Sequence, residues 1–195
     1  PLVLGAGIFL LLTTWKEGSR MIAEKRRRID IALDDFLSGP LPDVPRVEGT
    51  AVYLTSDPTL VPSALFHNLK HFKVMHERII FLNVINEDIP HVAPAQRMQV
   101  KELAAGIYSV AVHFGFREEP DLSLALEHAS DFGIELDSMS TTYFVARSTV
   151  VEGPGGLPAW RSGLYAWMTR QAEGAASYFN LPPNRVVELG THVML

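Results

Sequence analysis

The residues with the greatest capacity for chemistry gather at positions 65–77, in the stretch LFHNLKHFKVMHE. His67 and His71 are four residues apart, so a helix would place them on one face. His76 and Glu77 follow shortly afterwards, and imidazole and carboxylate groups at such spacings can hold zinc. The stretch contains no His-Glu-x-x-His sequence, however, and its two lysines would repel a cation. We therefore expect no metal here and interpret the histidines as hydrogen-bonding, capping or interface residues.

The same region could instead hold an anion. Lys70, Lys73 and Arg78 accompany the histidines. Thr55 and Ser56 end a strand-like segment just before a helix-like one, where phosphates bind in many α/β proteins. A nucleotide is thus a candidate ligand, although no glycine-rich phosphate loop occurs, and solvated basic side chains are the alternative. The candidate ligand-binding residues are Thr55, Ser56, His67, Asn68, Lys70, His71, His76 and Glu77.

Catalysis finds no support in the sequence. The chain of 195 residues has no cysteine, which excludes thiol nucleophiles, disulfides and cysteine-ligated zinc. No G-x-S-x-G occurs, and the scattered serine, histidine and aspartate residues form no recognisable arrangement. We therefore predict no enzyme, no catalytic residue and no cofactor.

The candidate residues lie in a predicted β-α-β unit. Residues 47–55 are rich in β-forming side chains, and residues 62–72 have a helical apolar face that begins at a proline. Residues 78–85 form a nearly continuous apolar run, which is typical of a strand buried on both faces. Such a unit implies two parallel strands joined by a right-handed crossover.

The rest of the chain adds strands and helices to this unit. Residues 98–105 and 107–114 predict a hairpin or a bent strand around a glycine, and residues 152–158 predict a loop. The remaining predicted elements are a helix at 121–132 with Asp121 as its cap and Gly133 as its stop, a strand at 142–147, a strand at 185–189, and the longest helix at 160–179, with a stripe of Trp160, Leu164, Trp167, Met168, Gln171 and Ala175. The fold class is therefore α/β, a mixed sheet with flanking helices.

The start of the chain differs from all that follows. Residues 1–15 carry no charge, and residues 1–28 have a net charge of +4 from six basic and two acidic residues. Residues 29–195 have 11 basic and 20 acidic residues, a net charge of −9. The apolar run would span about 22 Å as a helix, less than the hydrocarbon core of about 30 Å. We interpret it as the end of a transmembrane helix that begins before this fragment, and an apolar helix packed on the domain is the alternative.

Four segments are predicted from these patterns. Residues 1–15 are the end of the last transmembrane helix, 16–37 a basic juxtamembrane helix, 38–45 a linker of proline and glycine, and 46–195 an α/β domain. The basic segment would attract anionic lipid headgroups and would lie on the cytoplasmic side. Nucleic acid is not an expected partner, because the rest of the chain is acidic. The residues expected to face lipid headgroups are Lys16, Arg20, Lys25, Arg26, Arg27 and Arg28.

Several motifs, taken together, resemble one known family. They include GTAVYLT at 49–55, VPSALFHNLKH at 61–71 and His76-Glu77-Arg78. Further matches, in order, are Gly115-Phe116, Pro120-Asp121, Tyr143-Phe144 with Arg147, Trp160-Arg161, Tyr178-Phe179, Leu181-Pro182 and 184–190 (NRVVELG). The chain is similar, over nearly its whole length, to the last membrane exit and C-terminal cytoplasmic domain of Kup-type potassium uptake transporters. Phe72 departs from the asparagine expected after the Lys-His pair.

The resemblance implies a multi-pass parent in the plasma membrane that takes up potassium, together with protons, as a symporter. The ion-binding residues of the family lie in membrane helices that this sequence lacks, so this part would be regulatory or dimer-forming. Its implied partners are the rest of the same transporter, the lipid bilayer, a second copy in a homodimer and, as a candidate, a nucleotide. The alternative hypothesis is an autonomous, membrane-anchored α/β domain that binds nucleotides.

Overall fold

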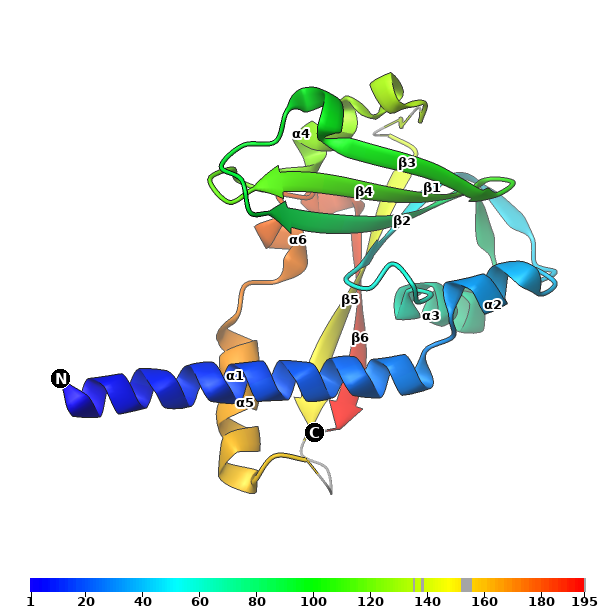
Figure 1. Cartoon of the computed structure of the whole chain (residues 1–195). Helices are drawn as coiled ribbons and strands as arrows, with labels where there is room; N and C mark the ends of the chain where they lie inside the picture. The colour runs from blue at the N-terminus through cyan, green and yellow to red at the C-terminus, as the bar shows by residue number, and fades with distance from the viewer. Residues whose placement is uncertain (135, 138, 152–155, 195) are drawn as a thin grey trace. The chain divides into compact units, whose positions relative to one another are not determined.

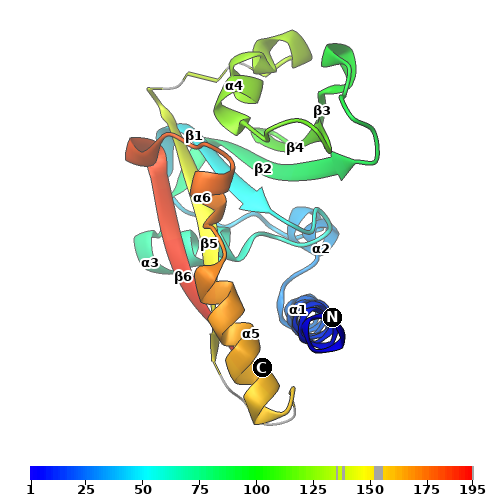
Figure 2. The ribbon, with the colours of Figure 1, turned by 90° about the vertical axis from the view of Figure 1, so that its left-hand side faces the viewer.

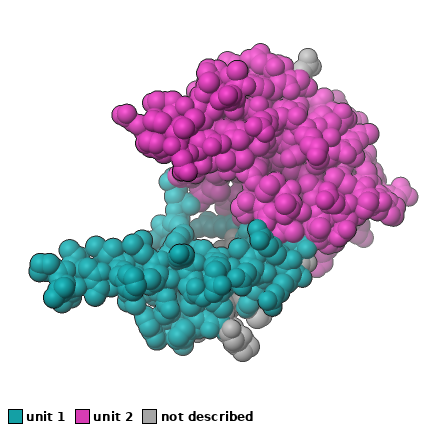
Figure 3. All heavy atoms as spheres, in the orientation of Figure 1, with its two compact units in different colours: residues 1–30, 147–173, 190–195 teal, residues 31–146, 174–189 magenta. Residues whose placement is uncertain are grey.

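The computed structural model describes residues 1–134, 136–137, 139–151 and 156–194. The chain divides into two compact units (Figure 3). Unit 1 comprises residues 1–30, 147–173 and 190–195, and unit 2 comprises residues 31–146 and 174–189. The predicted loop at 152–158 falls partly on residues 152–155, which lie outside the described residues.

A mixed six-stranded sheet is the main element of the fold (Figures 1 and 2). Its order is β3-β4-β2-β1-β5-β6, and β2, β1, β5 and β4 pair in parallel while β3 is antiparallel to β4. The strands are β1 (Arg46–Thr55), β2 (Met75–Glu87), β3 (Met98–Ala104), β4 (Ile107–Gly115), β5 (Thr141–Val151) and β6 (Val186–Met194). The predicted mixed α/β fold and the parallel β-α-β unit are thus confirmed.

One of the α-helices is long, and the others are short. The α-helices are α1 (Leu2–Ile29), α2 (Leu33–Ser38), α3 (Ser63–Phe72), α4 (Leu122–Glu127), α5 (Ala159–Gln171) and α6 (Ala175–Tyr178). Three short 3₁₀ turns are present at Pro94–Gln96, Ala129–Phe132 and Pro183–Arg185. Among the described elements α1 is the longest helix, so the prediction that the longest helix spans residues 160–179 is wrong.

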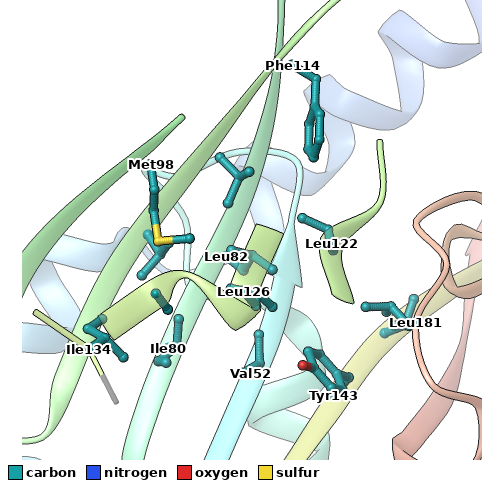
Figure 4. Packing of buried hydrophobic residues seen from close by; sticks show 14 residues of the cluster. Val52, Ile80, Leu82, Met98, Phe114, Leu122, Leu126, Ile134, Tyr143 and Leu181 are labelled. Carbon is teal, nitrogen blue, oxygen red and sulfur yellow. The ribbon is translucent and has the colours of Figure 1, made fainter. Parts of the chain in front are cut away.

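The alternation of side chains along each strand builds one core on each face of the sheet. In β2, Ile79 and Phe81 point to one face, and Ile80 and Leu82 point to the other. The first face is covered by α2 and α3, and the second by α4, as Figure 4 shows for Leu122 and Leu126. Each fully buried side chain of this size contributes about 1.5–3 kcal/mol, so both faces stabilise the sheet.

The juxtamembrane helix predicted over residues 16–37 is not continuous through its whole length. Helix α1 ends at Ile29, and the next residues leave the helix to pair with the segment before α3. The amide of Leu33 donates to the carbonyl of Thr59, and the amide of Val61 donates to the carbonyl of Ile31. These bonds replace the helical ones, because the extended chain satisfies its polar groups with a neighbouring segment.

Two further helices are interrupted where the sequence predicts continuity. The predicted helix at 121–132 becomes α4 and a 3₁₀ turn, although Asp121 caps it through its bond from the Leu124 amide and Gly133 ends it at φ 86°. The helix predicted at 160–179 stops at Gln171, since Ala172 is extended and Gly174 precedes the separate helix α6. Glycine disfavours helix interiors, which accounts for the second break.

The stripe predicted on the same helix is also not its buried face. Trp160 and Trp167 are 59% and 52% exposed, whereas Ser162 and Tyr165 are buried. The spacing of Trp160 and Trp167 therefore does not identify the side of the helix that packs.

Gly106 in the β3-β4 hairpin provides a test of the sheet geometry. It has φ 76°, and a Cβ atom there would lie 2.5 Å from the carbonyl oxygen of Glu77 on β2. We expect Gly106→Ala to lower the free energy of unfolding by about 2 kcal/mol or more, since the left-handed conformation alone costs about 1–2 kcal/mol. Urea unfolding followed by circular dichroism measures this change. Gly190→Ala is the matched control, because its φ is ordinary and no atom lies within 4 Å of the added Cβ; equal stability losses would contradict the interpretation.

Candidate functional site

The predicted ligand residues lie at two opposite ends of the β-α-β unit. Thr55 and Ser56 follow the carboxyl end of β1, whereas His76 is paired with Val47 near the amino ends of β1 and β2. Thr55 is eight residue steps along the strand from Val47, which corresponds to about 26 Å at the usual rise of a β-strand. Helix α3 runs back between these ends. The structure therefore brings Lys70, His71, His76 and Glu77 to one end and Thr55 and Ser56 to the other.

The polar groups of the Thr55 turn are engaged locally. The Thr55 hydroxyl donates to the carbonyl of Asp57 at 2.9 Å and accepts from the Asp57 amide at 3.3 Å. The Asp57 carboxylate accepts from the amide and the hydroxyl of Thr59. These bonds form a compact turn before α3, so its geometry is accounted for without a bound ligand.

The histidines of α3 are stacked and the lysines lie at its end. The rings of His67 and His71 are 6.0 Å apart with an interplanar angle of 11°. Lys70 and His71 occupy the last turn, and Lys73 ends the helix with φ 55°. Cations at a helix C-terminus are favoured by the helix dipole, while a phosphate there would be disfavoured. Nucleotide binding at these residues therefore stays a prediction with no added support from the geometry.

His76 is half-buried and lies apart from the other two histidines. Its ring contacts Phe144 edge to face at 5.9 Å, and its Nδ1 atom is buried without a hydrogen-bond partner. Burial lowers the pKa of His76, so the ring is neutral at pH 7. Within the described residues, no group of three or more histidine, aspartate or glutamate side chains could hold a metal ion.

Asn68 faces the core. It is 2% exposed, and its side-chain amide donates to the hydroxyl of Tyr53 at 2.8 Å. Burial raises the pKa of Tyr53 to about 12, so the phenol stays protonated. The Tyr53 ring also stacks on Phe144 at 4.8 Å. Asn68 thus joins α3 to two strands, a role that the sequence pattern did not indicate.

A double-mutant cycle tests this role. We expect Asn68→Ala to lower the free energy of unfolding by about 1–3 kcal/mol, because the buried Tyr53 hydroxyl loses its partner. Tyr53→Phe should reduce the cost of removing Asn68, and the difference measures the coupling between the two side chains. The neighbouring Lys70→Ala is the control, since Lys70 is exposed. If Asn68→Ala and Lys70→Ala had the same small effect, Asn68 would be no structural link.

A pocket of about 840 Å³ lies at the carboxyl end of β4, beside α4. It was not predicted. Its lining residues are Pro94, Ala95, Arg97, Phe114, Glu118, Glu119, Asp121, Leu124, Ala125, His128, Asp131 and Phe132. The position fits the rule that ligands of α/β sheets bind beyond the carboxyl ends of strands, and its volume would accommodate a small organic molecule.

An ion pair between Arg97 and Glu118 forms one wall of this pocket. The guanidinium donates to both carboxylate oxygens at 2.6 and 2.7 Å, and to the carbonyls of His113 and Val92. The carboxylate also accepts from the amide of Gly115 at 2.6 Å. The guanidinium lies 5.1 Å from the centre of the Phe114 ring. Hydrogen bonds from Arg97 are the main cause that lowers the pKa of Glu118 to about 2.

This bonding decides what the pocket can accept. The terminal nitrogens of Arg97 are already committed to Glu118 and to two carbonyls, so a phosphate would have to displace them. Asp121 caps α4 and also accepts from Asn180, while Glu119 and Asp131 add carboxylates to the rim. The pocket is therefore better suited to an apolar, neutral or cationic molecule than to a phosphate.

Replacing Glu118 should reveal the stabilisation that its ion pair supplies. We expect Glu118→Gln to lower the free energy of unfolding at pH 7 by about 2 kcal/mol, the usual value for hydrogen bonds to a charged group. Because the pKa of Glu118 is lower in the folded chain than the ordinary value of about 4.3, its contribution is present above pH 4.3 and is lost as the pH falls towards 2. Urea unfolding from pH 7 to pH 2 should show the two proteins converging.

The exposed neighbour Glu119 supplies the control for this series. Glu119→Gln should change the stability little, and the small difference should stay nearly constant with pH. A constant gap between the Glu118 variant and the unmodified chain across the acid range would show that the ion pair has no such role.

A second polar and aromatic contact lies within unit 1, between α1 and α5. The ring of Tyr165 packs against Gly18, where an added Cβ would lie 2.5 Å from the ring, and its hydroxyl bonds Ser19 at 3.2 Å. Trp15 contacts the same ring at 5.5 Å. Arg161 donates through Nε to the hydroxyl of the fully buried Thr14 at 3.1 Å. The helix α5 is therefore anchored on α1 where the apolar residues give way to basic ones.

Helix α1 has 28 residues, and its charged residues begin at Lys16. Among the described residues, no helix combines sufficient length with sufficient apolar character to cross a bilayer. Most of its apolar side chains from Leu2 to Leu12 are nevertheless exposed.

The fold defines a class of chain with two parts: a unit built on a mixed sheet with flanking helices, and a unit in which α5 packs on a long helix with an apolar start. Residues 48–195 match the family described as the K+ potassium transporter C-terminal domain, and the chain belongs to that family. The family consists of transporter domains and is no known class of enzyme. No solved structure matches the chain.

Several curated proteins are similar to the chain over its whole length. It is 48% identical over 197 residues to the probable potassium transport system protein Kup of Aromatoleum aromaticum, and 46% identical to that of Azoarcus sp. strain BH72. Both alignments cover 100% of the chain and 31% of the relative. The Kup protein of Xylella fastidiosa strain Temecula1 is 46% identical over 99% of the chain. The chain thus spans about a third of the length of these relatives.

Proposed function

We propose that this chain is the C-terminal portion of a potassium uptake transporter of the Kup type. The supporting observation is the alignment of the whole chain with about a third of each Kup relative, at 43–48% identity for the first three. In this proposal the parent protein lies in the plasma membrane and takes up potassium together with protons. The ion pathway belongs to the parent's membrane helices, and the present chain conducts no ion.

The start of the chain provides the connection to the membrane. In the proposal, residues 1–15 are the end of the last transmembrane helix and residues 16–37 form the basic segment beneath it. The unbroken helix α1, which joins the apolar start to the basic residues, supports this arrangement. The basic side chains favour the cytoplasmic side and anionic headgroups, at about 1 kcal/mol each near the surface.

The role of residues 46–195 in this proposal is to regulate the transporter or to hold two copies together. Support comes from the α1-α5 contact, since α5 belongs to the family-matched part of the chain and α1 leads towards the membrane. A change in α5 can therefore reach α1 through Tyr165 and Arg161. Residues 38–45, with three prolines, would act as the linker.

Removal of residues 46–195 from the parent tests whether this domain regulates or assembles the transporter while the membrane helices select the ion. We expect the truncated transporter to keep its preference for potassium over sodium, because selectivity resides in membrane helices. Its regulation, amount in the membrane or assembly should change. Rubidium uptake in cells lacking other potassium systems, with sodium as competitor, measures the first property, and quantitative blotting of membranes with crosslinking measures the others.

The intact parent, expressed at a matched membrane level, is the reference for that experiment. A truncated protein that transported sodium as readily as potassium would contradict the proposal. A parent that supported no rubidium uptake at all would refute the transporter assignment itself.

A further inference from the structure

All three tryptophans of the chain lie on the two packed helices of unit 1. Trp15 is on α1, and Trp160 and Trp167 are on α5. They are 41%, 59% and 52% exposed, which is unusual for the largest apolar side chain. Tryptophan is enriched at membrane–water interfaces, where its ring sits among headgroups. Half-exposed tryptophans confined to one unit therefore suggest a shared environment that is neither water nor the protein core.

The position along α1 at which α5 packs also indicates an environment at the membrane–water interface. Its contacts on α1 are Thr14, Trp15, Gly18 and Ser19, where the uncharged run ends and Lys16 begins the basic segment. In Figure 1, α5 runs across α1, and in Figure 2, α1 is seen end on while α5 extends across the view. If α1 enters the bilayer, α5 consequently lies along the bilayer surface at the depth of Trp15.

The direction in which the tryptophans point follows from two contacts. Arg161 reaches Thr14, whereas Tyr165 reaches Ser19, so turning around α5 from Tyr165 to Arg161 leads towards the apolar start of α1. With about 3.6 residues per turn, the side chains that come next in this direction are Met168, Leu164, Gln171, Trp160 and Trp167, of which only Gln171 is polar. The apolar side of α5 thus begins on the flank of the helix nearer the proposed membrane.

The charges of α5 suit an anionic surface. The helix carries Arg161 and Arg170 and no carboxylate. Lys16 and Arg20 follow on α1, next to the contact, where Arg20 forms ion pairs with Glu17 and Glu24 and Lys16 adds a further cation. Basic residues beside an apolar helix face are typical of segments that lie in the headgroup region of anionic membranes.

We propose that α5 is an interfacial helix that rests on the cytoplasmic membrane surface, with Trp160 and Trp167 among anionic lipid headgroups. This inference rests on the proposed membrane exit of α1. It assigns the exposed face of α5 to lipid and not to a second copy of the chain or to another protein.

Single-tryptophan variants of the 195-residue chain provide the test. Trp160 is retained alone in W15F/W167F, Trp167 alone in W15F/W160F, and Trp15 alone in W160F/W167F. Each is mixed with vesicles of equimolar phosphatidylcholine and phosphatidylglycerol, in which the phosphatidylcholine carries bromine near the top of its acyl chains. We expect all three tryptophans to lose emission to the brominated lipid, to shift to shorter wavelengths and to be protected from aqueous acrylamide. Phosphatidylcholine alone should weaken these effects at Trp160 and Trp167.

The control is the free chromophore N-acetyltryptophanamide mixed with the same vesicles, which should stay unquenched by the lipid and open to acrylamide. Circular dichroism confirms that each variant is folded. Quenching of Trp15 without quenching of Trp160 and Trp167 would overturn the inference, as would equal quenching of N-acetyltryptophanamide. A blue shift that grows with protein concentration, without lipid quenching, would assign the face to a second copy and overturn it as well.

Rubidium uptake by the parent distinguishes this inference from the function on which it rests. Uptake by the parent, with Trp160 and Trp167 exposed to water, would refute only the interfacial helix. No uptake, with both tryptophans quenched by lipid, would refute only the transporter assignment.

Discussion

Burial of β1 and β2 on both faces is the constraint on which the rest of unit 2 depends. Neighbouring residues such as Ala51, Val52 and Tyr53 all have no exposed surface, although successive side chains point to opposite sides. A sheet of this kind needs a cover on each face. Helices α2 and α3 supply one cover and α4 supplies the other, so the short helices are required by the strands that they shield.

Two sets of polar contacts stabilise unit 2, one inside a core and one beyond the strand ends. Asn68 joins α3 to β1 inside one core, where the Tyr53 hydroxyl would otherwise lack a partner. Arg97 and Glu118 hold the segments before β3 and after β4 together beyond the strand ends. Both arrangements are satisfied internally. The domain therefore presents few strong donors to an anionic ligand at the places where α/β proteins often bind one.

The sequence was most informative where one local pattern decided the outcome. The apolar run at 78–85 indicated a strand buried on both sides, and Gly106 marked the hairpin, because a continuous apolar run and a glycine between two β-rich segments leave clear signals. The break at Asp30 was missed because it depends on partners elsewhere in the chain: Ile31 and Leu33 exchange helical bonds for bonds to Val61 and Thr59. Helical spacing alone could not anticipate that competition.

The candidate site shows the same limit. Its eight residues were grouped by nearness in sequence or by chemical type, yet parallel pairing placed Thr55 and His76 at opposite ends of the strands. Arg97 and Glu118 are 21 positions apart and lie outside any motif, so their ion pair becomes visible only once β4 and its neighbours are placed. The nearest signal was the position of Glu118 between Gly115-Phe116 and Pro120-Asp121, just past a predicted strand.

The order of segments in the two units has a consequence for how this protein can change in evolution and in the laboratory. Unit 1 is assembled from three separate stretches of chain, and the polypeptide passes from one unit to the other at four places, after residues 30, 146, 173 and 189. No single cut in the gene can release either unit whole. Exchange of one unit between related proteins would need several coordinated crossovers, which favours inheritance of the long first helix and the α/β domain as one module.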